Sequence, residues 1–283
     1  MYYQDKGSKN IFAGLQLAAV FAMAIALATA PLAHAQCDPP PNGTMVAWYP
    51  FDELAGPTSA NLATQNTGVW SLTPPPIPGV GEVAGALNFG GNSYVDTPDS
   101  IVTNFGPAGP CGVGGGDYST CQGNFSMDTW LNITVLPNIV ETIVDKRDAT
   151  PIGYTFYLYR NTVFTPNVYL GVQLGDSTGF TSYSFSLPIL NKPGIWHHVA
   201  VTVNRLGKIT YYLDGAPKGT LVPARVLSLE NKVPLRIGAN GPANGGGSFF
   251  NGLLDELEIY NRVLTAAEVK AIFAAGPAGK CKP

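Results

Sequence analysis

The sequence is poor in charge and lacks the short motifs that mark many enzymes. Only 12% of its 283 residues are charged, the formal net charge is −3, and no basic cluster is present. Such a chain offers little to nucleic acid or to an anionic membrane surface, so neither is an expected partner. We find no phosphate-binding loop, no cofactor fingerprint and no serine–histidine–acid grouping. We therefore assign no catalytic residue, and lean against an enzyme.

Long apolar runs are also scarce, and the main one lies at the N-terminus. Lys6 and Lys9 precede the apolar segment Leu17 to Ala28, and Ala33-His34-Ala35 forms a small-x-small cleavage site. This pattern predicts a signal peptide over residues 1–35, cleaved after Ala35. A retained transmembrane anchor is the alternative, because the apolar stretch approaches the length of a membrane span. Cleavage makes the protein secreted, periplasmic or cell-surface, with no membrane segment left.

Cysteine is used four times, always after the predicted cleavage site. An exported chain meets conditions that permit disulfides, and four cysteines allow three pairings. We expect Cys111 to pair with Cys121 across a short glycine-rich loop, and Cys37 to pair with Cys281 and so join the two ends of the mature chain. A metal site is the alternative, but no Cys-x-x-Cys spacing supports it.

Glycine and proline are abundant, with 33 and 24 residues. Short alternating runs such as "YTFYLYR" and "NVYLGVQL" are separated by turn residues, a pattern typical of β-strands. Asp214-Gly215 predicts a tight hairpin. We expect an all-β fold, a two-sheet antiparallel sandwich. The predicted organisation is a lead-in over 36–44, one domain over 45–275, and a tail over 276–283 that carries Cys281.

One helix is expected near the C-terminus. Thr265 is a suitable N-cap, and Glu268 three residues later completes a capping box. Leu264 and Val269 are spaced as a hydrophobic staple, and Gly276-Pro277 ends the helix.

Seven segments occur in an order that resembles a known family. They are "WYPFDE", "GALNFGGNSYVDTP", "NFSMDTWL", "GIWHHVAVTVN", "ITYYLDG", "PLRIGAN" and "FNGLLDELEIYNRVLTAAEV". Together they resemble the laminin-G-like jelly-roll domains of the concanavalin A-like lectin/glucanase superfamily, over about residues 45–275. The resemblance implies an antiparallel jelly roll whose first and last strands are neighbours. It leaves the function open, because such domains bind glycans, proteins or calcium.

The segment "LLDELEIY" concentrates three acids, Asp255, Glu256 and Glu258. Strict alternation along a strand would place Asp255 on an apolar face with Leu257, and would turn Glu256 and Glu258 toward solvent or the end of the sandwich. Glycoside hydrolysis requires two carboxyls across an open cleft. The glucanases of the superfamily carry Glu-x-Asp-x-x-Glu, which is missing from the printed sequence. We therefore interpret these acids as part of the scaffold.

A structural calcium ion is a more specific version of that interpretation. Asp52 or Glu53 near the first strand would join Asp255 if the terminal strands are neighbours, and calcium prefers such oxygen ligands. The alternative is that Asp255 accepts hydrogen bonds from the backbone or from Arg236. No other cofactor is expected.

Tyrosines give the strongest indication of binding. Alternation predicts that Tyr157, Tyr159, Tyr169 and Tyr212 point outward from their strands, where they would form a platform for sugar rings if the strands are neighbours. The alternative is that they lie in the interior or under loops. We expect an exported, noncatalytic module that binds an extracellular glycan. A structural or adhesive protein with protein partners is the second hypothesis, and a glycan-cleaving enzyme the third.

Overall fold

The computed structural model describes residues 37–39, 44–109, 123–160 and 167–283. The chain divides into Met1–His34 and a compact unit, Ala35–Pro283, to which all described residues belong. The predicted signal peptide and the predicted Cys111–Cys121 pair lie outside the described residues. Within the described ranges, no helix is long and apolar enough to cross a membrane.

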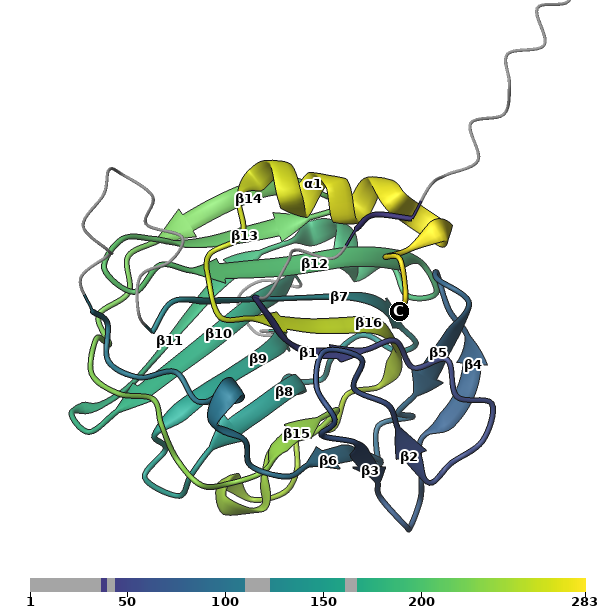
Figure 1. The fold of residues 1–283 in the computed structure, drawn as a ribbon, viewed down its shortest axis with the longest axis horizontal. Helices are drawn as coiled ribbons and strands as arrows, with labels where there is room; N and C mark the ends of the chain where they lie inside the picture. Colours follow the sequence, from purple (N-terminus) through teal and green to yellow (C-terminus); the bar gives the residue numbers. More distant parts are fainter. Residues whose placement is uncertain (1–36, 40–43, 110–122, 161–166) are drawn as a thin grey trace, which may run out of the picture. The chain divides into compact units, whose positions relative to one another are not determined.

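Antiparallel strands of the compact unit form two sheets, which we call sheet I and sheet II (Figure 1). The strands of sheet I, in spatial order, are β14 (Ala216–Leu221), β13 (Ile209–Leu213), β12 (Trp196–Val203), β7 (Phe125–Ile133), β16 (Gly252–Tyr260), β5 (Gly85–Asn88) and β4 (Ile77–Val80), with β1 (Met45–Tyr49) also paired to β16.

The strands of sheet II, in spatial order, are β11 (Gly179–Ser186), β10 (Val168–Asp176), β9 (Gly153–Arg160), β8 (Val140–Arg147), β15 (Leu235–Ile237), β6 (Val95–Thr97), β3 (Gly68–Trp70) and β2 (Thr58–Ser59). Short 3₁₀ turns occupy Ile101–Thr103, Pro188–Asn191, Pro242–Asn244 and Gly276–Ala278.

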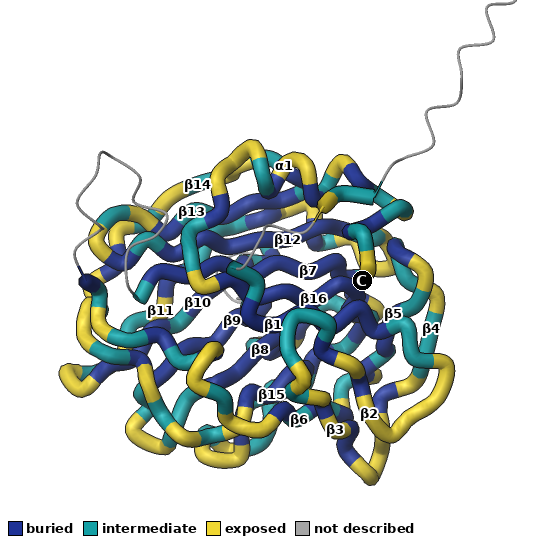
Figure 2. Tube along the Cα trace, viewed as in Figure 1, coloured by how far each residue is buried: buried dark blue, intermediate teal, exposed yellow. Residues whose placement is uncertain are grey.

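The core lies between the two sheets (Figure 2). Phe125 and Met127 of β7 in sheet I and Phe156 and Leu158 of β9 in sheet II belong to one cluster of buried apolar side chains. In each strand these residues alternate with side chains on the outer face, as the period of two requires. The predicted all-β, two-sheet antiparallel jelly roll is confirmed.

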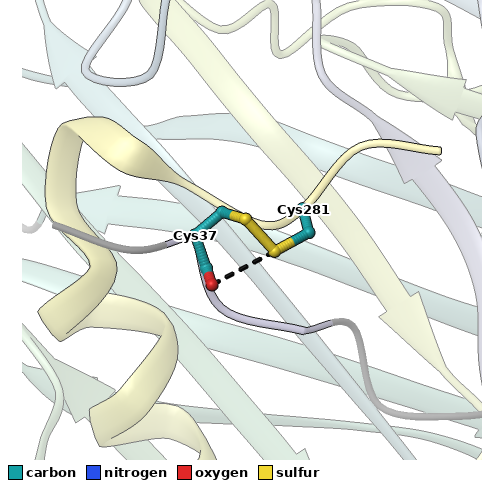
Figure 3. The surroundings of a disulfide bond; sticks show 2 residues. All are labelled: Cys37 and Cys281. Atoms are coloured by element: carbon teal, nitrogen blue, oxygen red, sulfur yellow. Dashed lines mark hydrogen bonds between the residues drawn. A yellow bond between two sulfur atoms is a disulfide. The ribbon is translucent and has the colours of Figure 1, made fainter. Parts of the chain in front are cut away.

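The two ends of the described chain meet on sheet I. β1 pairs antiparallel with β16, as the family resemblance implied. Beyond these strands Cys37 and Cys281 form the predicted disulfide, across a sequence separation of 244 residues (Figure 3). Asp38 pairs with Lys280 in a short parallel bridge beside it. The Sγ atom of Cys281 also lies 3.1 Å from the carbonyl oxygen of Cys37, a contact without hydrogen bonding because a disulfide sulfur carries no proton.

Helix α1 (Ala266–Ala275) covers part of the outer face of sheet I. Thr265 and Glu268 form the predicted capping box, with the backbone N–H of each residue bonded to the side chain of the other. Val269 and Ile272 pack in a second apolar cluster with Tyr260 of β16. The predicted hairpin is also present, since Asp214 and Gly215 both have positive φ between β13 and β14.

The C-terminal tail brings two cations to the same outer face. Lys280 Nζ lies 2.5 Å from Glu258 Oε2, and Lys282 Nζ lies 2.9 Å from Glu256 Oε1. Cys281 lies between the two lysines in sequence, so its disulfide fixes the segment that supplies both cations. The tail therefore closes the covalent frame and also compensates buried negative charge.

Replacing both Cys37 and Cys281 with serine is expected to lower the free energy of unfolding by roughly 2–4 kcal/mol. The physical reason is that the disulfide restricts the unfolded chain and holds the tail lysines on the carboxylates. Chemical denaturation of the variant and the native protein, with Cys111 and Cys121 unchanged in both, measures the difference. Equal midpoints and slopes for the two proteins would contradict this assignment.

Candidate ligand-binding site

A pocket of about 410 Å³ opens on the outer face of sheet II. It lies over β8, β9, β10 and β11, which are consecutive neighbours in that sheet. The side chains that line it include Arg147, Tyr157, Tyr159, Gln173, Ser182, Ser184 and Asn240. Pockets of a few hundred Å³ are typical of small-ligand sites, and this one is our candidate site.

Strand alternation explains why these side chains face the pocket. In β9, Phe156 and Leu158 lie in the core, whereas Tyr157 and Tyr159 line the pocket. In β11, Tyr183 packs into the core while the neighbouring serines of "SYSFS" face outward. The inner positions hold the sandwich together, and the outer positions supply the lining.

The ring of Tyr157 forms part of the pocket floor because Gly171 leaves room for it. These residues are partners on β9 and β10. A Cβ atom at Gly171 would lie 2.4 Å from Cζ of Tyr157, so any other residue would displace the ring. Burial raises the pKa of Tyr157, and a hydrogen bond with Ser182 opposes this shift. The tyrosine is therefore a fixed neutral phenol, with 8% of the residue exposed.

Loop 238–251, between β15 and β16, forms one wall of the pocket through Asn240 and Ser248. Asp145 of β8 accepts a hydrogen bond from the backbone of Gly241 at 2.7 Å. The side chain of Asn244 donates to the backbone oxygen of Arg147 at 2.8 Å. These bonds hold a glycine-rich loop against β8.

Arg147 joins the loop wall to the floor. Its Nε donates to Asp145 Oδ1 at 2.5 Å, and its Nη2 donates to Asn240 Oδ1 at 3.3 Å. Its Nη1 donates to Gln173 Oε1, and Gln173 Nε2 in turn donates to Ser182 Oγ at 2.9 Å. The guanidinium thus fixes both amide groups with their oxygens toward Arg147.

Three of the four predicted tyrosines are brought together. Tyr157 and Tyr159 line the pocket, and the rings of Tyr159 and Tyr169 are 6.0 Å apart between centroids. Tyr212 is on β13 of sheet I, where it lines a different pocket beside Leu264. The expectation that Tyr212 shares the same platform is therefore wrong, because its strand belongs to the opposite sheet.

Several lining residues were missed by the sequence reasoning. The alternating serines of "SYSFS" carry a signal that identifies Ser182 and Ser184 as outward-facing. Arg147 and Asn240 have no such signal in the sequence. They meet because loop 238–251, which follows β15 of sheet II, brings Asn240 next to β8.

The acids of β16 are arranged differently from the prediction. A β-bulge interrupts the pairing of β16 with β7 between Asp255 and Glu258, and Glu256 has positive φ. The bulge changes the alternation, so Leu257 faces the core and Asp255 does not share its face. Glu256 and Glu258 do not face solvent, because they are 3% and 0% exposed.

Asp128 of β7 joins Glu258 beneath the tail. The two residues are cross-strand partners, and burial raises their pKa values to about 6 and about 8. Lys280 contacts Glu258, while His198 Nε2 lies 3.0 Å from Asp128 Oδ2. Burial also lowers the pKa of His198 to about 3, so this ring is neutral. One lysine cannot compensate two buried carboxylates, so the pair retains a proton at neutral pH.

Asp255 accepts a backbone hydrogen bond from Val83 at 2.7 Å, and burial raises its pKa to about 9. The backbone alternative is thus confirmed, while the Arg236 alternative is wrong because Arg236 pairs with Asp96. Asp52 binds Lys282 and accepts from the backbone of Gly85.

The described hydrogen bonds and ion pairs of Asp52 and Asp255 are with protein groups. Among the residues that the structure describes, no group of three or more His, Cys, Asp or Glu side chains is arranged to hold a metal ion. A calcium ion at Asp52 and Asp255 would need further oxygen ligands from the backbone or from water.

Comparison with known families identifies the chain. Residues 89–270 match the model of the Concanavalin A-like lectin/glucanases superfamily. The match spans more than half of the chain, and the protein belongs to this family. This agrees with the resemblance seen in the sequence.

Two proteins of known structure are similar to this chain. Paraclostridial mosquitocidal protein 1 of Paraclostridium bifermentans is 30% identical over 164 residues, which cover 53% of this chain and 12% of that protein. The crystal structure of its binding domain aligns with a TM-score of 0.58 at 19% identity, over 81% of this chain and 52% of that one.

The second is domain 4 of AbnA, a GH43 extracellular arabinanase from Geobacillus stearothermophilus, in complex with arabinotriose. It aligns with a TM-score of 0.56 at 19% identity, over 80% of this chain and 97% of that one. Both structural likenesses establish the fold alone.

Stability is expected to fall as pH rises from about 6 to about 9. Asp255 and Glu258 have folded pKa values of about 9 and about 8, above their ordinary values of 3.8 and 4.5. A carboxyl whose pKa is raised by folding stabilises the folded state fully at pH values below its ordinary pKa. This stabilisation is lost as pH rises toward the pKa of the folded state. Each proton retained by the folded state contributes a slope of up to about 1.4 kcal/mol per pH unit.

Denaturation midpoints across this pH range measure the slope. The control is Asp255→Asn, which keeps the acceptor for Val83 but removes one titration, and the slope should become shallower. A native free energy of unfolding that is flat or rises between pH 6 and 9 would refute the protonated state of the cluster.

Proposed function

We propose that this protein is an exported, noncatalytic module that binds an extracellular glycan in the pocket of sheet II. The observation that carries the proposal is a tyrosine-floored pocket whose described lining includes no carboxylate. Export is supported by the signal-peptide pattern of residues 1–35.

The lining matches the chemistry of a sugar. A sugar ring has apolar C–H faces that pack on aromatic rings, and Tyr157 and Tyr159 supply such surfaces. Its hydroxyl groups need hydrogen-bonding partners around the rim. Gln173, Ser182 and Ser184 surround the tyrosines with an amide and two hydroxyls. Apolar floor and polar rim together favour a glycan over a purely apolar ligand.

The distribution of acids supports a noncatalytic role. A glycosidase needs two carboxyls that flank the scissile bond. Asp128, Glu256 and Glu258 belong to sheet I, and each is buried or paired beneath the tail. Asp145 is near the pocket, but its oxygens are occupied by Arg147 and Gly241.

Two similar structures support a binding role. The arabinanase domain was solved with arabinotriose, and the mosquitocidal protein contributes a domain described as its binding domain.

A protein partner is the second candidate. The edge strand β4 exposes Ile77 and Val80, which are 65% and 82% exposed. Pro78 lies between them and lacks a backbone N–H, so it weakens this edge as a template for strand addition. The pocket of sheet II is therefore the better supported site.

Replacing Ser184 with tryptophan is expected to abolish glycan binding, because the indole fills the pocket without entering the core. The matched control is Thr210→Trp, which places the same bulk on the outer face of sheet I, where Thr210 lines another pocket. A glycan array with mature protein measures binding. Retained binding by Ser184→Trp, or loss confined to Thr210→Trp, would remove the site from sheet II.

We also propose, from the sequence, a structural calcium ion at Asp52 and Asp255. Calcium should raise the melting temperature, and EDTA should reverse the change. The effect should be larger at pH 9 than at pH 7, because a proton on Asp255, whose folded pKa is about 9, competes with the ion. Thermal unfolding of the native protein and of Asp255→Asn tests this. Identical curves with calcium and with EDTA at both pH values would exclude the ion.

A further inference from the structure

The amide and carboxylate oxygens at the pocket of sheet II are already occupied by protein donors. The Asn240 Oδ1 atom accepts from both Thr142 Oγ1 and Arg147. Gln173 Oε1 accepts from Arg147, and both oxygens of Asp145 are occupied by protein donors. The strong acceptors around the pocket are therefore satisfied by the protein itself.

Arg147 is the one charged donor in the described lining of the pocket, and it has N–H groups to spare. A guanidinium carries five N–H groups, and the protein contacts described above use three of them, one on each nitrogen. The remaining two belong to Nη1 and Nη2. Because 11% of the side chain is exposed and Arg147 lines the pocket, a ligand can reach this group.

The guanidinium is held rigidly before any ligand arrives. Its Nε bonds to Asp145, whose side chain is 0% exposed and is itself held by the backbone of Gly241. Arg147 also acts electrostatically on Tyr157, so the cation and the stacking surface lie close together. A preorganised arginine loses little entropy when it binds a planar anion in two-point fashion.

We propose that the pocket selects saccharides that carry a carboxylate, such as uronic acids, and that Arg147 is the residue that determines this preference. The inference rests on the proposed glycan-binding function. A carboxylate on a ring stacked against Tyr157 or Tyr159 would satisfy the two spare N–H groups. A neutral sugar would leave them to water, and an amino sugar would bring a second cation to Arg147.

Three matched saccharides test the proposal: disaccharides that end in glucuronic acid, glucose or glucosamine but are otherwise identical. Calorimetric titration of the native protein should show at least tenfold tighter binding of the glucuronic acid compound than of the glucose compound, and the weakest binding for glucosamine. The titrations are done at two salt concentrations, because general charge attraction is screened by salt.

The variant Asp145→Asn/Arg147→Gln removes the cation and its buried counterion together, which avoids leaving Asp145 unpaired. It should bind the glucose and glucuronic acid compounds with equal affinity, so that the ratio of the two dissociation constants, which is the quantity compared with the native protein, falls to about one. Lys218→Gln is the control for net charge, because it removes one exposed cation on β14 of the other sheet. This control should keep the full preference for the acid.

The outcomes separate this inference from the proposed function. Glucose binding equal to or tighter than glucuronic acid binding by the native protein, and still sensitive to Ser184→Trp, would overturn the acid preference while glycan binding stands. A preference that persists in the double variant would overturn the role of Arg147. Failure of every saccharide on the array and in titration would remove both proposals.

Discussion

The structure depends on how negative charge is buried on the outer face of sheet I. Asp128 and Glu258 are cross-strand partners under the C-terminal tail, where isolated carboxylates would be prohibitively costly. Lys280 compensates one negative charge of this pair, which keeps a proton at neutral pH, and Lys282 contacts both Glu256 and Asp52. The disulfide at residue 281 lies between these two lysines. The disulfide and the ion pairs of the tail lysines therefore involve the same segment, and both hold β1 and β16 together.

The two outer faces have different tasks. On sheet I, α1 and the tail cover the acids, and the carboxyl groups remain partly protonated because burial raises their pKa values. On sheet II, the corresponding surface is open over β9 to β11 and presents tyrosines, hydroxyls and amides. The acids of sheet I, which could be mistaken for a catalytic pair, thus have a structural role under the C-terminal tail. The described lining of the pocket there provides uncharged groups around Arg147, which Asp145 compensates.

Much of the fold was predictable because its signals are local. Strand alternation, the Asp214-Gly215 turn and the capping box of Thr265 each depend on a few neighbouring residues. Which residues of β16 face the core was not predictable, because a bulge adds one residue at Glu256 and reverses the alternation beyond it. Nothing in "LLDELEIY" shows where such a bulge falls.

The candidate site was predictable only in part, for a related reason. Alternation identifies Tyr157 and Tyr159 as outward-facing, but sheet order decides which tyrosines share a surface, and this separated Tyr212 from them. Arg147 reaches Asn240 across 93 positions in sequence, through a loop with no recognisable pattern. Ligand preference in this fold therefore depends on long-range contacts that core patterning does not fix.

The separation of core and lining positions also explains why family membership does not define a ligand. Each strand under the pocket commits alternate residues to the core, and those residues maintain the sandwich. The intervening residues face outward, where a change such as Ser184 to a larger side chain alters the pocket without opening a cavity in the core. Gly171 is the exception, since its missing side chain sets the position of Tyr157. The residues that contact a ligand can thus change at outward positions, while the sandwich, held by the disulfide and the tail lysines on sheet I, stays the same.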